Sequence, residues 1–201
     1  MFTNPASEQT LQRVVAGLKE RNIEGVVVNT MDEARKLVLD KLPRGAEVHF
    51  GKSKTLQDAA ILDLIANSEA YDALRPRYLK MDRQTQAREI RKLIAGPDYM
   101  LGSVNAVTED GMLVGASATA SQLGPYANTA GKVILVVGSQ KIVPDLQTAI
   151  RRIREYVLPW EDLQVRPLVP TGSFVGKIPI VEREWISGRL EVILVRKPIG
   201  I

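Results

Sequence analysis

The sequence predicts an α/β protein with a mostly parallel, doubly wound sheet and crossover helices. Two observations support this prediction. Short runs of β-branched and other apolar residues alternate along the chain with segments of helical periodicity. Polar loops that contain glycine connect several of these runs to the helix that follows. The length of 201 residues and the hydrophobic content of 45% fit a single domain over 1–201, with its core at about 7–197.

Apolar periodicity places the individual elements. Over 7–21 the apolar residues recur at the spacing of one helix face. Thr30, followed three residues later by Glu33, has the form of a capping box, and the helix that it opens stops before Pro43. The expected helices are at 7–21, 30–42, 56–64, 84–94 and 144–157, and the expected strands are at 26–28, 47–50, 99–104, 133–137 and 190–195.

Two segments depart from this alternation. Between 105 and 114 the turn Glu109-Asp110-Gly111 separates two apolar stretches, which predicts a hairpin added to the parallel sheet. Residues 158–188 contain four prolines and little helical periodicity, so we expect an extended excursion across the surface. Trp160 and Trp185 bracket this excursion and are expected to anchor it onto the domain.

The composition excludes several kinds of site. The chain has no cysteine, so it offers no disulfide, no thiol nucleophile and no cysteine-ligated zinc or iron–sulfur site. Its one histidine, His49, lies in the middle of an expected strand, where alternating burial accounts for it without any chemistry. We therefore expect no metal site, and the sequence leaves the cofactor unknown.

The net charge and the hydropathy of the chain limit the kinds of partner that it can bind. The formal net charge is +4, and no block of five like charges occurs. This small excess suits a small anionic ligand and not nucleic acid, which requires a clustered basic face. The densest basic group, Arg151, Arg152 and Arg154, is expected to be a solvated helix face. Because the amino terminus is polar and no apolar stretch reaches about 18 residues, we expect a cytoplasmic protein outside the membrane.

Three polar loops follow expected strands, at the edge of an α/β sheet where ligands usually bind. The loop 51–55 offers backbone N–H groups, two lysines and two hydroxyls to an anion, or it is a glycine turn with a helix cap. It lacks the upstream glycine of a Walker motif. The loop 138–141 offers amides and one lysine. The loop 108–111 brings together two carboxylates, one of which could act as a base or nucleophile in a buried site.

Four segments together resemble the LUD-domain family of lactate-utilisation proteins. The likeness covers nearly the whole chain and is most specific at 105–111 and 138–143. It implies a fold similar to that of the ribose-phosphate isomerase and coenzyme A transferase superfamily. The segments are GKSKTL at 51–56, SVNAVTEDGMLV at 103–114, VILVVGSQKIVPDLQTAIRRI at 133–153 and VILVRKPIGI at 192–201.

The resemblance also implies roles for single residues. In coenzyme A transferases the nucleophile is a glutamate in a Glu-x-Gly turn after a strand, so the resemblance makes Glu109 the candidate catalytic residue. The chain departs from its relatives in two places: it lacks a cysteine group at 169–185, and 116–122 lacks the charged residues common there. The candidate ligand-binding residues are Gly51, Lys52, Ser53, Thr55, Asn105, Thr108, Gly111, Gly138 and Lys141.

Members of this family take part in the bacterial oxidation of L-lactate to pyruvate, alongside iron–sulfur and oxidoreductase partner proteins. The resemblance therefore implies an accessory subunit or a small-anion-binding protein in the oxidation of lactate or another carboxylate. Two alternatives stay open. One is an independent enzyme that acts on acyl-coenzyme A or sugar phosphates through Glu109. The other is a binding or oligomerisation module without catalysis, and the apolar end of the chain could pair with a second copy.

Overall fold

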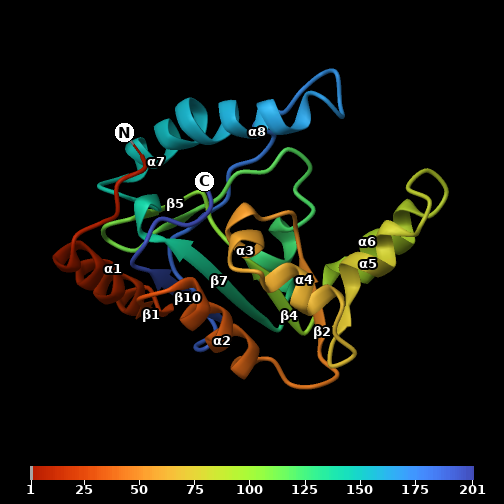
Figure 1. Ribbon diagram of the computed structural model, residues 1–201, viewed down its shortest axis with the longest axis horizontal. Helices are drawn as coiled ribbons and strands as arrows, with labels where there is room; N and C mark the ends of the chain where they lie inside the picture. Colours follow the sequence, from red (N-terminus) through yellow and green to blue (C-terminus); the bar gives the residue numbers. More distant parts are fainter. Residues whose placement is uncertain (1) are drawn as a thin grey trace.

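The computed structural model describes residues 2–201 and shows helices packed around two sheets (Figure 1). The α-helices are α1 (Glu8–Glu20), α2 (Met31–Lys41), α3 (Lys54–Asp58), α4 (Ile61–Ala66), α5 (Leu74–Leu79), α6 (Ala87–Ala95), α7 (Leu146–Arg152) and α8 (Leu158–Val165). Three short turns of helix are η1 (Pro125–Thr129), η2 (Ser139–Lys141) and η3 (Ile153–Val157). The strands are β1 (Glu24–Val28), β2 (Glu47–Phe50), β3 (Asp72–Ala73), β4 (Tyr99–Gly102), β5 (Ala106–Thr108), β6 (Leu113–Val114), β7 (Lys132–Gly138), β8 (Ile142–Val143), β9 (Ile180–Val181) and β10 (Leu190–Val195).

The larger sheet confirms the predicted α/β class. Its six strands run parallel in the order β1-β10-β7-β4-β2-β3. Successive strands of the chain are joined through helices, as parallel neighbours require. The smaller sheet has the order β8-β5-β6-β9, and its β5–β6 pair is the antiparallel hairpin expected between 105 and 114.

Strand β7 shows why the large sheet is buried on both faces. Ile134 and Val136 pack into a cluster with α2, α3 and α4 on one face. Val133, Leu135 and Val137 point the other way, into a cluster that contains α1 and part of the small sheet. The side chains alternate because successive residues of a strand face opposite sides. A continuous apolar run such as 133–137 is therefore the expected sequence of a central parallel strand.

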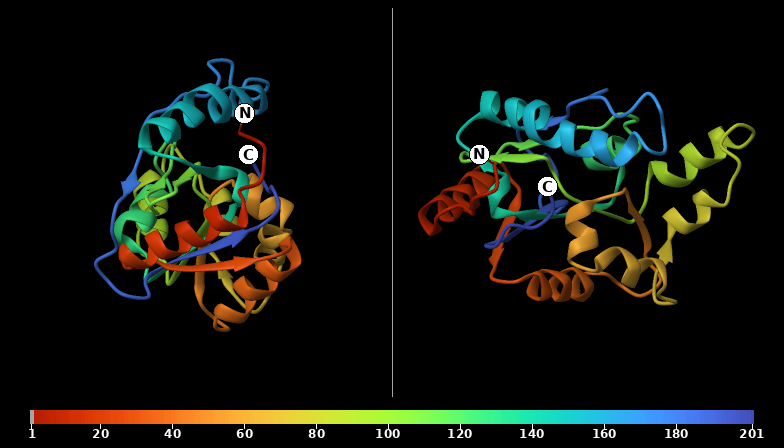
Figure 2. Two further views of the ribbon diagram at one scale, coloured as in Figure 1. Left: turned by 90° about the vertical axis from the view of Figure 1, so that its left-hand side faces the viewer. Right: turned by 45° about the horizontal axis from the view of Figure 1, so that its top comes forward.

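The helices after β7 correct one expectation. Residues 158–165 form α8 and not an extended segment, and α7, η3 and α8 follow one another as a long bent helix across one end of the sheets (Figures 1 and 2). Pro159 stands in the first turn of α8. Proline is tolerated there, and the wide π-type turn of η3 before it absorbs the change in helix geometry. Four prolines in 158–188 therefore did not exclude a helix.

Two other elements differ in detail from the expectations. The helix expected from 56 to 64 is interrupted at Ala60, whose φ of 55° separates α3 from α4. Helices α5 and α6 project away from the sheets (Figures 1 and 2), so the apolar face of α6 has no fully buried residue. Trp185 is 93% exposed, which makes its expected anchoring role wrong. Over the described part of the chain, no helix is both long and apolar enough to span a lipid bilayer.

Candidate functional site

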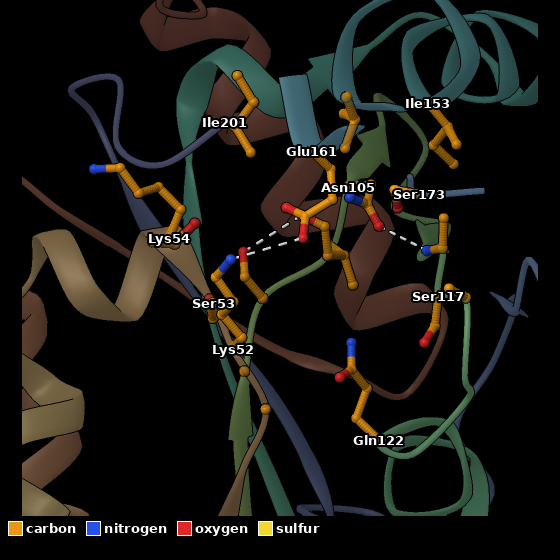
Figure 3. Close-up of a pocket in the computed structure, with 18 of the residues that line it drawn as sticks. Lys52, Ser53, Lys54, Asn105, Ser117, Gln122, Ile153, Glu161, Ser173 and Ile201 are labelled. Carbon is orange, nitrogen blue, oxygen red and sulfur yellow. Dashed lines mark hydrogen bonds and ion pairs between the residues drawn. The ribbon is translucent and has the colours of Figure 1, made fainter. Parts of the chain in front are cut away.

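A cavity of about 330 Å³ lies where the carboxyl ends of β2, β4 and β7 meet (Figure 3). These strands are neighbours in the large sheet, so the loops that follow them converge. One wall comes from the loop after β2, and another from the segment after β4. Helix α8 and the residues at 173–175 cover the cavity from the side of the small sheet. Six of the predicted site residues line it: Gly51, Lys52, Ser53, Thr55, Asn105 and Lys141.

Lys141 extends its side chain to the bottom of this cavity. The residue is 3% exposed, and its Nζ lies 2.8 Å from Thr55 Oγ1 and 3.0 Å from Ser103 Oγ. The carbonyl oxygen of Val104 accepts a third hydrogen bond at 3.3 Å. All three partners are neutral oxygens. Within the described residues, no carboxylate lies within ion-pair distance of this amine.

The setting of Lys141 changes its acidity. Its pKa is lowered from 10.5 to about 7; burial is the largest cause, the positive charge of Arg152 acts in the same direction, and the charge of Asp58 acts in the opposite one. Burial has this effect because a low-dielectric surrounding disfavours the charged amine. Near neutral pH, both the protonated and the neutral amine are therefore present.

Arg152 supplies a second buried positive charge, which corrects its expected place on a solvated helix face. The residue is fully buried, and its Nη1 donates a hydrogen bond to the carbonyl oxygen of Asn105. Its guanidinium lies 5.3 Å from the ring centroid of Tyr156 and 5.8 Å from that of Phe2. Burial lowers its pKa to about 10, so it stays charged at neutral pH. Arg151 and Arg154 are exposed, as expected.

Asn105 joins the two sheets at the cavity. It lies between β4 and β5, and its Oδ1 accepts a hydrogen bond of 2.6 Å from the backbone N–H of Ala116. This bond fixes the amide plane and leaves Nδ2 as the donor of the amide, and Asn105 lies among the residues that line the cavity (Figure 3). Arg152 holds the backbone of the same residue from behind. The side chain is thus positioned to donate to a bound acceptor.

The rim of the cavity is polar and mainly basic. Lys52, Lys54 and Arg75 all line it, and the one acidic residue of its lining is Glu161 of α8. Lys54 pairs with Asp58, and Lys52 lies 3.9 Å from Glu161. In the described residues Arg75 has no carboxylate partner; its Nη1 donates to the hydroxyl of Tyr78.

The stretch at 116–122, which lacks the charged residues of relatives, forms the wall opposite the loop after β2. Ser117 and Gln122 face the cavity from this wall (Figure 3). A Cβ at Gly51 would lie 2.5 Å from Oε1 of Gln122, so the glycine allows the two walls to approach. This segment therefore lines the site with neutral hydrogen-bonding groups in place of charges.

Four predicted site residues lie outside the cavity. Glu109 is at the far end of β5, where its carboxylate pairs with Arg13 of α1 at 2.7 Å. Thr108 is fully buried, and its Oγ1 accepts a hydrogen bond from the backbone of Met112. Gly111 packs its backbone against α1, and Gly138 packs against the carboxyl-terminal segment. The assignment of Glu109 as nucleophile stays a prediction, and the structure places this carboxylate on the hairpin turn beside α1.

His49 lies within the sheet, in the buried position expected for it. It is 1% exposed, and its ring meets the ring of Tyr78 edge-on with centroids 5.8 Å apart. Its pKa is lowered to about 4, mainly by burial and in smaller part by the positive charge of Arg75. His49 is therefore neutral at physiological pH. In residues 2–201, no group of three or more His, Cys, Asp and Glu side chains is arranged to hold a metal ion.

Sequence reasoning missed several residues of the cavity. Ser103 directly follows β4, so its place at a strand end was a usable indication. Arg75 and Glu161 reach the cavity from helices that the sequence did not connect with it. Tyr126 of η1 donates its hydroxyl proton to the carbonyl oxygen of Ser103 and so supports the wall after β4. Burial raises the pKa of this hydroxyl, which remains protonated.

Comparisons with known proteins agree with the fold. A family model described as the LUD domain matches residues 11–195. Among solved structures, a DUF162 family protein from Deinococcus radiodurans superposes with a TM-score of 0.59 and 12% sequence identity, covering 95% of this chain and 99% of that chain. At this identity the likeness concerns the fold alone. A search of curated proteins finds no match.

Proposed function

The chain belongs to the LUD-domain family, and we propose that it acts as a small-anion-binding protein or accessory subunit in bacterial oxidation of lactate or another carboxylate. One observation carries the binding part of this proposal. The amine of Lys141 is buried at the bottom of a polar cavity with only neutral oxygens as partners. Buried charges in proteins are normally paired, so an anionic ligand would supply the missing partner.

The charges around the cavity support the same proposal. Arg75 on the rim and Arg152 behind Asn105 both lack a carboxylate partner among the described residues. Together with Lys141 they make the local potential positive, although the whole chain carries only +4. Such a potential favours a carboxylate or phosphate over a neutral ligand.

The size of the cavity limits the ligand. A volume of about 330 Å³ lies at the small end of the range for ligand sites. Asn105, Ser117 and Gln122 also line the cavity, and their neutral donors would orient the ligand by hydrogen bonds. A small hydroxy or oxo acid has the right charge and polar groups for this lining.

The role in lactate metabolism rests on the family, and we propose it with its partners. On this proposal the redox centres belong to iron–sulfur or oxidoreductase proteins that associate with the domain. An affinity purification of the tagged protein from cells grown on lactate, compared with cells grown on glucose, tests this association. Recovery of the same proteins from both cultures, with none of the redox type, would count against it.

The binding itself is tested by thermal unfolding with added ligands. The panel contains L-lactate, pyruvate, inorganic phosphate, ribose 5-phosphate and coenzyme A. A ligand at about 100 times its Kd stabilises the native state by about 2.7 kcal/mol, which raises the Tm measurably. We expect a small carboxylate to raise the Tm of the wild type but not of Lys141→Met. The matched control, Lys132→Met, changes an exposed lysine at the opposite end of β7 and should respond as the wild type does.

A further inference from the structure

The partners of Lys141 suit two protonation states of its amine. A protonated amine donates three hydrogen bonds, and three oxygens surround this Nζ. The neutral amine has only two protons and one lone pair. Two of its partners are the hydroxyls of Thr55 and Ser103, and a hydroxyl can donate as well as accept. The site can therefore hold the neutral amine without leaving a buried polar atom unpaired.

The surroundings also favour a reactive amine. A lysine becomes a nucleophile when burial or a neighbouring positive charge lowers its pKa, and both causes act on Lys141. Lys141 itself lines the cavity, and its Nζ is hydrogen-bonded to two other lining residues, Thr55 and Ser103, so a ligand in the cavity would lie beside the amine. Anion binding alone requires a positive charge and makes no use of a lone pair.

We propose that the Nζ of Lys141 forms an imine with the carbonyl carbon of a small oxo acid bound in the cavity. This inference rests on the proposed binding of a small carboxylate and adds the class of substrate. The carboxylate accounts for the basic side of the cavity, where Arg75 lines the rim without a carboxylate partner among the described residues. The carbonyl accounts for a nucleophilic amine at the bottom. A 2-oxo acid is the smallest molecule that carries both groups next to each other.

The step balances without any further reagent. The lone pair of Nζ attacks the carbonyl carbon, and the C=O π electrons move to the oxygen, which takes a proton. The resulting carbinolamine loses its hydroxyl group as water while nitrogen and carbon form the double bond. The hydroxyls of Thr55 and Ser103 lie within hydrogen-bond distance of Nζ and can carry the protons between nitrogen and oxygen. The reverse reaction with water restores the free lysine.

The test is chemical trapping on the purified full-length protein. The protein is incubated with pyruvate and reduced with sodium borohydride, and the modified lysines are located by peptide mass spectrometry. Borohydride converts an imine into a stable secondary amine. We expect modification of Lys141 at least about tenfold above that of the exposed Lys132, because an ordinary lysine is almost fully protonated at pH 7. The modification should increase from pH 6 to pH 8 as the amine loses its proton.

Three controls separate this inference from the proposed function. L-lactate has no ketone or aldehyde group with which the amine could form an imine, so it should raise the Tm without any trapping. Lys141→Arg keeps a positive charge but lacks the nucleophile, so it should lose the trapped product at this position. Lys132→Arg should leave trapping at Lys141 unchanged.

The outcomes lead to different conclusions. If pyruvate raises the Tm but borohydride leaves Lys141 unmodified, the imine is excluded and anion binding stands. If no small anion raises the Tm and no product forms, both proposals fail. If glyceraldehyde 3-phosphate is trapped at Lys141 and pyruvate is not, the oxo acid is the wrong substrate class. Selective trapping of pyruvate at Lys141 supports the inference as stated.

Discussion

The Nζ of Lys141 lies 2.8 Å from the Oγ1 of Thr55, although 86 residues separate them in the sequence. Lys141 follows β7 and Thr55 follows β2, and these two strands are not neighbours, because β4 lies between them in the sheet. The lysine therefore reaches past the end of β4, where it also meets Ser103. Three loops are joined at one nitrogen atom, and the geometry of the cavity depends on that atom.

Replacing Thr55 by valine tests the hydroxyl partner of this amine. The two side chains have similar shapes, so the fold should be retained while one hydrogen bond to Nζ is lost. A bond of this kind contributes about 1 kcal/mol, and we expect the affinity for a small carboxylate to fall by roughly fivefold. Isothermal titration calorimetry measures this change. Thr10→Val, at a partly exposed position of α1 outside the cavity, serves as the control and should bind with unchanged affinity.

The stability of the protein should rise between pH 7 and pH 9 because of Lys141. The folded state releases the proton of this amine near pH 7, whereas the unfolded state keeps it to about pH 10.5. Between these values the unfolded state binds more protons, so the free energy of unfolding increases with pH. The increase from pH 7 to pH 9 amounts to roughly 2 kcal/mol. Urea unfolding of the wild type and Lys141→Met at both pH values measures it, and equal pH dependence in the two proteins would disprove the lowered pKa.

Arg152 should matter for stability far more than its neighbours on the helix. Arg152→Ala removes the donor to the Asn105 carbonyl and leaves a space between Phe2 and Tyr156. We expect a loss of about 3 kcal/mol, from the cavity and the unpaired carbonyl together. Arg151→Ala changes an exposed side chain and should alter stability by less than about 0.5 kcal/mol. Similar losses in both variants, measured by urea unfolding, would contradict the burial of Arg152.

Two glycines with similar backbone angles should respond differently to alanine. Gly111 has a φ of 92°, and a Cβ there would lie 2.5 Å from the backbone of Gly17. Gly45 has a φ of 82°, but no atom lies within 4 Å of a Cβ at that position. Gly45→Ala should cost only the backbone strain of about 1–2 kcal/mol. Gly111→Ala adds a clash between hairpin and helix, so its melting temperature should fall further.

Glu109→Gln tests the hypothesis that this residue is a nucleophile. The carboxylate pairs with Arg13 at a partly exposed position outside the cavity. Exposed ion pairs contribute about 0–1 kcal/mol, so the variant should be nearly as stable as the wild type. We expect carboxylate binding to be unchanged as well. Loss of the trapped product or of ligand binding in Glu109→Gln, with Arg13→Gln unaffected, would support the nucleophile hypothesis instead.

The central fold followed from local patterns. The apolar pattern of the sequence placed two strands correctly, at 47–50 and at 190–195. The predicted capping box forms only in part. Thr30 caps α2 by accepting a hydrogen bond from the backbone N–H of Glu33, but the Glu33 carboxylate accepts from the backbone N–H of Asn29 and not from that of Thr30. Local signals of this kind are encoded within a few residues, so they can be recognised without knowing what packs against them.

The site was predictable only in part, because its remaining residues depend on packing. The loop at 51–55 and Lys141 follow strands, and strand ends converge in any parallel sheet. Arg152 belongs to a basic run that looks solvated, and its burial arises from the rings of Phe2 and Tyr156, one of them 150 positions earlier. Glu109 also follows a strand, but that strand, β5, belongs to the small sheet. The turn after β5 lies beside α1, where Glu109 pairs with Arg13. Periodicity gives the ends of strands but does not tell which sheet a strand joins.

The different positions of the two tryptophans provide an optical readout. Trp160 lines the cavity, whereas Trp185 is almost entirely in water on the segment before β10. The fluorescence of the two tryptophans should therefore differ. Iodide should readily quench the red-shifted emission of Trp185. The emission of Trp160 should change when a ligand occupies the cavity. In the Trp185→Phe variant only the emission of Trp160 remains. Binding could then be followed in a stopped-flow instrument without attaching any dye.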